Sequence, residues 1–477
     1  MSVESNRRWW TLAGCCTGLF LLMLDSTIVT LALPSMQRDL GASTAELQWV
    51  ANGYLLTIGA LVVTLGRLGD IRGRRPVFAW GLATFGAGAV LAALAADPAL
   101  VIAGRFVQGI GGSSVLALSL AIASAAFPEA ERPRALGIWA GVSAAALALG
   151  PLLGGVLVEA ASWRWVFWSA VPFVLLGIAL VHVAGGGDEE RAEGRLDIPG
   201  VVTLTLGLSL GILALVQGPQ WGWESPETTI SAAAGVVALV AFWIVEHRVE
   251  NPIVDFAIFH NGPYFGATAA AFALVGCWWP VIFYQPQYLQ NVLGYSAIEA
   301  GFLILPVTLP MVFLSPGAGR LIKRFGARAL MTFGMVSGVA GLVFLTRISG
   351  TADYGSILPG YLLFGLALSL VYAPMSAAAM AAMPDAKAGI AAGVLAMNRI
   401  LAGALALAAV GAVYQHLEAE ELAAMASRDD AASYALGSSA WILVALCAVG
   451  TVLTWAFVRD APPPEPHDTH RHRRLHL

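Results

Sequence analysis

The chain has 477 residues, of which 58% are hydrophobic and only 12% are charged, and its formal net charge is -4. An ordinary soluble domain carries roughly 25% charged residues, so this composition excludes that class and predicts an integral membrane protein. The weak negative charge, without a basic face, excludes a nucleic-acid-binding protein. The cysteines have no metal-ligand spacing, and no metal or cofactor is expected.

Fourteen apolar segments are long enough to cross a bilayer, which requires roughly 20 mostly apolar residues. The first begins after Arg7 and Arg8 and is too long for the apolar core of a signal peptide, so it is predicted to be a retained spanning helix. The predicted spans are about 10–33, 47–65, 77–96, 98–122, 135–158, 165–184, 198–217, 228–246, 263–284, 297–316, 329–347, 355–382, 390–415 and 438–458. The chain is therefore predicted to be all-α.

The basic residues predict which side of the membrane each loop faces, because short loops rich in lysine and arginine stay cytoplasmic. If the N-terminus lies inside, 20 of the 26 lysines and arginines fall in cytoplasmic segments and four fall in outer loops. Both termini are then cytoplasmic. The remaining two, Arg105 and Arg399, fall within predicted spans.

A ten-residue segment between the second and third spans recurs in the second half of the chain. Residues 66–75 read GRLGDIRGRR and residues 319–328 read GRLIKRFGAR. Such a repeat indicates one unit written twice. We expect two six-helix bundles, at 1–184 and 263–460. Residues 185–262 then form a cytoplasmic connector and two inserted spans, and the proline- and histidine-rich tail, 461–477, is expected to be disordered and cytoplasmic.

Asp25 is an acidic residue inside the first span. A carboxylate at this depth costs on the order of 2.5 to 3.5 kcal/mol on insertion scales, so it needs a cavity or a partner. Arg105 in the fourth span is expected at the same level, roughly 10 to 12 Å below the outer surface. Gln108, one turn further, lines the same cavity or bonds a neighbouring backbone. A change in the distance from Asp25 to Arg105 or to water would switch its protonation, although a static ion pair is the alternative.

Glycine and proline mark the fifth span as a candidate gate. A helix-breaking Pro151 predicts a kink, because proline removes one internal hydrogen bond. Small residues four apart allow another helix to approach closely. The residues concerned are Gly141, Gly150, Pro151, Gly154 and Gly155. We expect a hinge or a seal between the bundles; simple helix packing is the alternative.

The repeated loop is a second candidate gate. Asp70 is its one acid among four arginines, including Arg74. The simpler interpretation is that these arginines only keep the loop in the cytoplasm. Gly69 and Gly73 favour more than that, because glycine permits tight turns and close backbone approach. Gly66, which begins the segment, is included in the candidate gate. Lys323 stands at the position of Asp70 in the second copy, so the two halves are not equivalent.

Three further polar residues are candidates for the cavity. Glu299 follows Ser296 in a capping-box pattern, which favours helix capping over proton or substrate binding. Arg399 needs an acid, a carbonyl or a substrate group as its partner. Tyr284 belongs to an aromatic stretch, 278–284, whose side chains either line a lipophilic pocket or anchor the span at the membrane interface.

These motifs resemble those of the major facilitator superfamily, and within it the fourteen-span drug:proton antiporter branch. Residues 66–75 are similar to the family's loop signature, and residues 24–34, LDSTIVTLALP, to the first-helix motif whose acid is associated with coupling. Residues 105–109, RFVQG, resemble the fourth-helix motif whose arginine is implicated in proton transfer. The glycine and proline pattern at 141–155 resembles the motif of antiporters.

The resemblance implies a proton-coupled antiporter that exports lipophilic drugs or antibiotics across the bacterial cytoplasmic membrane by alternating access. Its partners would be a small lipophilic substrate, protons and membrane lipids, with a monomer as the default state. The proton gradient would take the place of a cofactor. A proton-coupled uptake symporter for a small solute is the alternative. A membrane-embedded enzyme is disfavoured, since nothing in the chain resembles a nucleophile with its base.

Overall fold

The computed structural model describes residues 3–129, 131–185, 196–249, 252–314, 317–348, 353–384, 387–424 and 427–459. All fourteen predicted spans are confirmed, because each corresponds to a helix that is long and apolar enough to cross a membrane. The all-α prediction is confirmed as well, since no strand occurs in these described ranges. The predicted tail, 461–477, and connector residues 186–195 lie outside them.

The first half of the chain contains six spans. Its helices are α1 (Val3–Leu40), α2 (Thr44–Arg72), α3 (Arg74–Ala93), α4 (Pro98–Ala125), α5 (Arg132–Ala160), α6 (Arg164–Trp168) and α7 (Ala170–Ala184), of which α6 and α7 together form the sixth span. Polar caps set several helix starts. Ser43 and Glu46 form a capping box at α2, and Asp97 accepts a hydrogen bond from Leu100 at α4.

Two helices separate the halves, namely α8 (Ile198–Trp221) and α9 (Pro226–Glu246), which are followed by the 3₁₀ helix η1 (Phe256–His260). The second half again contains six spans. Its helices are α10 (Gly262–Gln287), η2 (Tyr288–Val292), α11 (Ala297–Leu314), α12 (Ala318–Phe325), α13 (Ala327–Leu345), α14 (Tyr354–Ala381), α15 (Ala388–Ala423) and α16 (Arg428–Phe457). The helix η2 is a π-helical continuation of α10.

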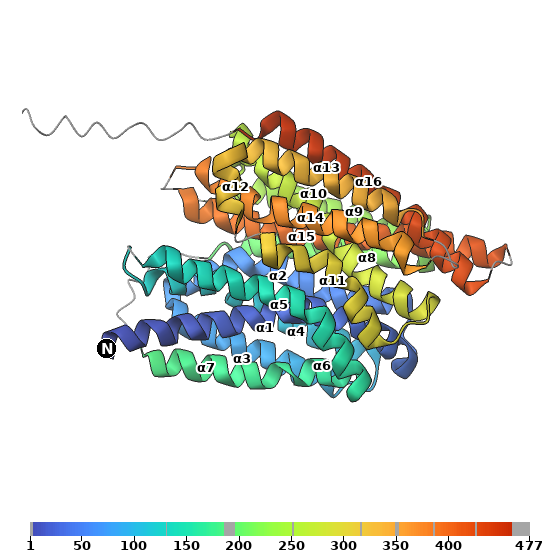
Figure 1. Ribbon diagram of the computed structural model, residues 1–477, viewed down its shortest axis with the longest axis horizontal. Helices are drawn as coiled ribbons and strands as arrows, with labels where there is room; N and C mark the ends of the chain where they lie inside the picture. Colours follow the sequence, from blue (N-terminus) through green and yellow to red (C-terminus); the bar gives the residue numbers. More distant parts are fainter. Residues whose placement is uncertain are drawn as a thin grey trace, which may run out of the picture.

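The two halves lie against each other along their length. In Figure 1 the blue and cyan helices of the first half occupy the lower part, and the yellow to red helices of the second half lie above them. The seam between the halves is made by α2 packed on α15 and by α5 packed on α11, and α8 packs against both α2 and α15. Helix α8 therefore lies across the seam, and α9 packs on α8.

The repeat in the sequence is also a repeat of backbone geometry. Gly73 has a φ of 103° and lies between α2 and α3, and Gly326 has a φ of 81° and lies between α12 and α13. Both values fall in the region that glycine tolerates and other residues avoid. The end of the molecule that carries 66–75 and α12 is called the arginine-rich end below, and the end that carries α6 is called the opposite end.

Several helices are longer than their apolar runs. The first was expected to end near residue 33, but α1 continues to Leu40, so Asp25 lies deeper than predicted from the helix end. The extension carries Arg38 and Asp39, and Asp39 forms an ion pair of 2.6 Å with Arg164. Apolar length predicts only the part of a helix inside the hydrocarbon, whereas a helix can continue into the polar interface.

Candidate functional site

A buried ion pair lies at the centre of the first half. Arg105 Nη1 lies 2.6 Å from Asp25 Oδ2, and each side chain is only 3% exposed. Gln108 joins them, because its Nε2 donates to Asp25 Oδ1 at 3.2 Å and its Oε1 accepts from Arg105 Nη1 at 2.9 Å. The contact predicted from depth alone is therefore present, and it is a closed triad of α1 and α4 side chains.

Arg105 has further partners on α2. Its Nε donates to the carbonyl oxygen of Val50 at 2.9 Å, and its guanidinium lies 4.1 Å from the ring centre of Tyr54. A cation over an aromatic face is attracted by the ring quadrupole, most strongly where water is excluded. The arginine is thus held by a carboxylate, a carbonyl, an amide and a ring.

Glycines bring these helices close enough for the contacts. A Cβ on Gly109 of α4 would lie 3.0 Å from the carbonyl oxygen of Tyr54 on α2, and a Cβ on Gly104 would lie 2.8 Å from that of Gly88 on α3. Only glycine permits approach at this distance, as in other close helix contacts within membranes. The glycine-rich sequence of α4 therefore packs this helix closely against α2 and α3 and places Arg105 within reach of α2.

A small cavity adjoins the ion pair at the seam. Its volume is about 10 Å³, which is room for about one water molecule and far too little for a drug. The lining comes from both halves: Ser26, Val29, Thr30, Leu33, Ala51, Tyr54 and Arg105 from the first half, and Trp279, Phe283 and Leu407 from the second. Among these lining residues, Arg105 is the one side chain that is charged at neutral pH.

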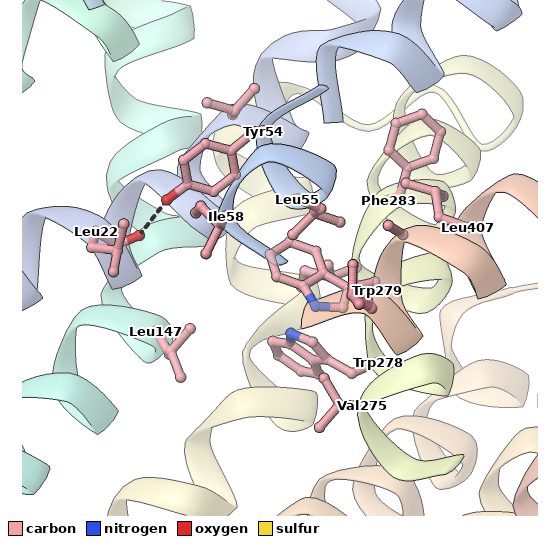
Figure 2. Close-up of a cluster of buried hydrophobic side chains, with 14 of the residues drawn as sticks. Leu22, Tyr54, Leu55, Ile58, Leu147, Val275, Trp278, Trp279, Phe283 and Leu407 are labelled. Carbon is pink, nitrogen blue, oxygen red and sulfur yellow. Dashed lines mark hydrogen bonds between the residues drawn. The ribbon is translucent and has the colours of Figure 1, made fainter. Parts of the chain in front are cut away.

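Aromatic and aliphatic side chains fill the rest of the seam. Figure 2 shows Trp278, Trp279 and Phe283 of α10 beside Tyr54 and Leu55 of α2, with the Tyr54 hydroxyl bonded to the Leu22 carbonyl. The two tryptophans are 6% and 8% exposed, so they are core residues of the seam rather than interface anchors. This central region is therefore largely lipophilic, and its charged groups are those of the triad.

The predicted kink of the fifth span has a partner on the first. Pro151 lies inside α5, and the carbonyl of Leu147, which proline leaves without its helical donor, accepts a hydrogen bond of 3.5 Å from the Thr27 hydroxyl. A Cβ on Gly150 would overlap that hydroxyl, and one on Gly154 would lie 2.7 Å from the carbonyl oxygen of Ile28. The glycines therefore fit α5 onto α1 within three residues of Asp25.

The same helix closes the seam at the opposite end. A Cβ on Gly155 would overlap the Ala297 carbonyl of α11, and one on Gly301 of α11 would lie 2.6 Å from the Pro151 carbonyl oxygen. Glu159 also accepts a hydrogen bond of 3.1 Å from the amide of Ile298. Gly141, at the arginine-rich end of α5, has no such neighbour, and its Cβ position is open.

The segment 66–75 was predicted to be a loop, but it consists of the end of α2, Gly73 and the start of α3, because α2 continues beyond its apolar run. It joins several helices of the first half. Asp70 and Arg74 form an ion pair of 2.8 Å, and Arg75 donates to the Thr11 hydroxyl of α1 at 3.4 Å. Gly66 lies in ordinary contact with α4, whereas Gly73 takes the positive φ that turns α2 into α3. The loop is therefore a tight, cross-linked turn, and its role as a gate stays a prediction.

The other candidates lie apart from the triad. Glu299 is exposed and forms a capping box with Ser296, which accounts for its carboxylate. Tyr284 is buried beside the seam and accepts a hydrogen bond of 3.0 Å from Gln48 of the other half. Arg399 is half-buried, with the Ser376 hydroxyl at 3.5 Å and the Tyr372 ring at 5.3 Å as its neighbours. None of the three lines the central cavity.

Sequence reasoning missed three contributors to this site. Tyr54, the Val50 carbonyl and the pairing of Gln48 with Tyr284 were not predicted. The available signal was the pair of amides in the second span, Gln48 and Asn52, which lie one helical turn apart and must share a buried face. In the described ranges, no group of three or more metal-ligating acids, histidines or cysteines comes together.

Comparison with known proteins agrees with this architecture. The model of the Major Facilitator Superfamily matches residues 15–407. Multidrug resistance protein Stp of Mycobacterium tuberculosis is 33% identical over 84% of this chain and 75% of its own. The tetracenomycin C resistance and export protein of Streptomyces glaucescens is 33% identical over 85% of this chain and 76% of its own. A D-xylose-proton symporter has a similar structure, with a TM-score of 0.67 and 15% identity over 95% of this chain and 98% of its own.

Proposed function

The chain belongs to the Major Facilitator Superfamily, and we propose that it exports small lipophilic drugs or antibiotics in exchange for protons. Its similarity to resistance and export proteins supports export rather than uptake. The observation that carries the proton coupling is the buried pair of Asp25 and Arg105 beside a cavity that both halves line.

Proton exchange at Asp25 follows from the arrangement of its neighbours. When the carboxylate is ionised, Arg105 and Gln108 stabilise it. When a proton from outside neutralises it, Arg105 retains the Val50 carbonyl, the Gln108 amide and the Tyr54 ring. Arg105 therefore keeps hydrogen-bond partners in both states, which lowers the free energy required to change the protonation of Asp25. If the acid were its only partner, the arginine would become an isolated buried charge once the acid was protonated, at a cost of several kcal/mol.

Alternating access then requires the two halves to separate at one end at a time. The contacts of α5 with α11 close the opposite end, whereas Gly141 at the arginine-rich end of α5 has open space around it. With the arginine-rich end toward the cytoplasm, we assign this arrangement to the state that is closed to the outside. Proton binding at Asp25 is expected to favour the state in which this seal opens and substrate leaves.

The proton gradient supplies enough free energy for useful export. One proton that crosses a potential of about 100 mV provides about 2.3 kcal/mol. A tenfold concentration ratio corresponds to about 1.4 kcal/mol, so one proton sustains roughly a fiftyfold gradient of a neutral substrate. A single coupling site is therefore sufficient, and no cofactor is required.

The proposal also covers the location, orientation and oligomeric state of the protein. The protein is a multi-pass membrane protein, and we place it in the bacterial cytoplasmic membrane, surrounded by lipid, as a monomer. Its arginine-rich end and both termini face the cytoplasm, because basic loops stay inside. The bundles comprise residues 1–184 and 263–460, and the substrate lies between them near the membrane midplane.

The direct test is drug susceptibility and accumulation in a bacterial host that lacks its own exporters. Cells that express the wild-type protein should accumulate less ethidium or tetracenomycin C and tolerate more of it than cells that carry the empty vector. Cells that express Asp25→Asn should resemble the empty vector at equal protein levels. Net accumulation of a solute by wild-type cells would instead favour the uptake symporter. Unchanged susceptibility to a broad panel of lipophilic compounds would contradict the export proposal.

A further inference from the structure

Two acidic side chains meet at the arginine-rich end of the inserted pair. Asp197 precedes α8, and its Oδ1 accepts a hydrogen bond of 2.9 Å from Gly200, which caps the helix. Glu246 is the last residue of α9, and its Oε2 accepts a hydrogen bond of 2.8 Å from the amide of Val254. One oxygen of each carboxyl group is therefore used to fix the backbone.

The second oxygens of these two groups face each other. Asp197 Oδ2 and Glu246 Oε1 are both buried, and neither has a hydrogen-bond donor among the described residues. Both lie within 2.6 Å of the position that a Cβ on Gly200 would take, so only a glycine leaves room for them. The side chains are 8% and 5% exposed, so water does not solvate them freely.

No described cation compensates this pair. The groups that follow Glu246 on the chain, His247 and Arg248, are exposed, and the His247 ring contacts the Trp243 carbonyl. Lys387, the cation that reaches the connecting segment, is already paired with Asp255 at 2.8 Å. Within the described part of the chain, neither Asp197 nor Glu246 forms an ion pair.

Two ionised carboxylates in this position would repel each other in a poorly solvated site. A single proton removes the repulsion, because it makes one oxygen a donor and the other its acceptor, which satisfies both orphan oxygens at once. A metal ion fits less well, since only two free oxygens converge there. We propose that Asp197 and Glu246 share one proton and form a second proton-binding site, separate from Asp25.

The shared proton would stabilise the contact between three parts of the structure. The start of α8, the end of α9 and the segment at 252–255 meet at these two side chains. Because α8 packs on both α2 and α15, loss of the proton would loosen the inserted pair where it covers the seam. The shared proton would make the inserted helices sensitive to the pH on the side of the membrane that the arginine-rich end faces, whatever the exported substrate is.

The test is thermal unfolding of the purified full-length protein in detergent across a pH series. Deprotonation of the pair would leave two facing negative charges, so the wild-type Tm should fall as the pH rises through the titration of the site. Glu246→Gln supplies a permanent N–H donor to Asp197, and Asp197→Asn supplies one to Glu246. Both variants should lack this alkaline loss, whereas the matched control Glu227→Gln, at the exposed start of α9, should keep it.

Infrared difference spectra between neutral and alkaline pH give a second readout. The wild type and Glu227→Gln should lose a protonated carboxylic acid band on alkalinisation, and Glu246→Gln should not. If one amide variant fails to accumulate, the other answers the question, because each supplies the missing donor. An alkaline loss of Tm that persists in the amide variants would overturn the proposal. Restoration of the alkaline Tm by added Na⁺ or Mg²⁺ would also overturn it, since a cation would then hold the pair.

Discussion

Gly301 of α11 is a position at which the seal between the two halves leaves no room for a side chain. A Cβ there would lie 2.6 Å from the carbonyl oxygen and 3.2 Å from the carbonyl carbon of Pro151, and 3.4 Å from Leu152 Cα. Optimal separations between carbon atoms are about 3.5 to 4.0 Å. Because all three atoms belong to the backbone of α5, Gly301→Ala can be accommodated only if α5 and α11 move apart.

The size of the effect follows from the cost of overpacking, which is about 1 to 3 kcal/mol. Alanine also raises helix propensity relative to glycine, but α11 is a helix in both states, so this gain does not alter the ratio between them. The clash alone should shift the population toward the state with the seal open by about 5- to 150-fold. Gly301→Ala is therefore expected to expose the opposite end of the seam.

The assay is labelling of a cysteine at Ile298→Cys, beside the seal, with a membrane-impermeant maleimide added from outside. The four native cysteines are buried and give a low background. Labelling should be faster in Gly301→Ala than in the parent. The matched control is Gly141→Ala, whose new methyl group has no atom within 4 Å and should leave the rate unchanged. Equal rates in all three proteins would refute the assignment of α5 and α11 as the seal.

Three further outcomes are expected. Asp70→Asn removes the ion pair with Arg74, whose side chains are 35% and 39% exposed, so the stability should fall by less than about 1 kcal/mol while transport slows; a large drop in Tm would show a structural role instead. Gly73→Ala forces alanine to a φ of 103° and should lower the free energy of unfolding by about 1 to 3 kcal/mol in a denaturant titration; an unchanged midpoint would contradict this. The hydrogen bond from Lys387 lowers the pKa of Asp255 from 3.8, so this pair stabilises the fold above that pH and less as the pH falls below it; Lys387→Ala should flatten that acid limb of a Tm series, and an unchanged limb would contradict the pairing.

The sequence predicted the helices well, because membrane spans depend on local properties. The length of an apolar run, a capping residue and the position of a glycine act within one or two turns. The turn at Gly73 and its repeat at Gly326 follow from such local chemistry. The ends of α1, α15 and α16 were misjudged because these helices continue beyond their apolar runs into a polar environment.

The candidate site was only partly predictable, because depth along a helix fixes which residues can meet but not which faces do. The similar depth expected for Asp25 and Arg105 made their contact possible, and the need of each buried charge for a partner favoured it. The Val50 carbonyl and the Tyr54 ring depend on how closely α4 approaches α2, which Gly109 decides through three-dimensional packing. The meeting of Asp197 with Glu246 similarly depends on how α8 and α9 cross, which no spacing in the sequence reveals.

The most direct test of the central claim is transport by the purified protein in liposomes with an imposed pH gradient, in which wild type is compared with Asp25→Asn. A substrate identified by the accumulation screen, or ethidium as the first probe, is followed by fluorescence. The wild type is expected to move substrate in the direction opposite to proton flow. The variant is expected to lose this driven transport while it still folds and equilibrates substrate without a gradient. Full gradient-driven transport by Asp25→Asn would contradict the account and locate the coupling proton elsewhere.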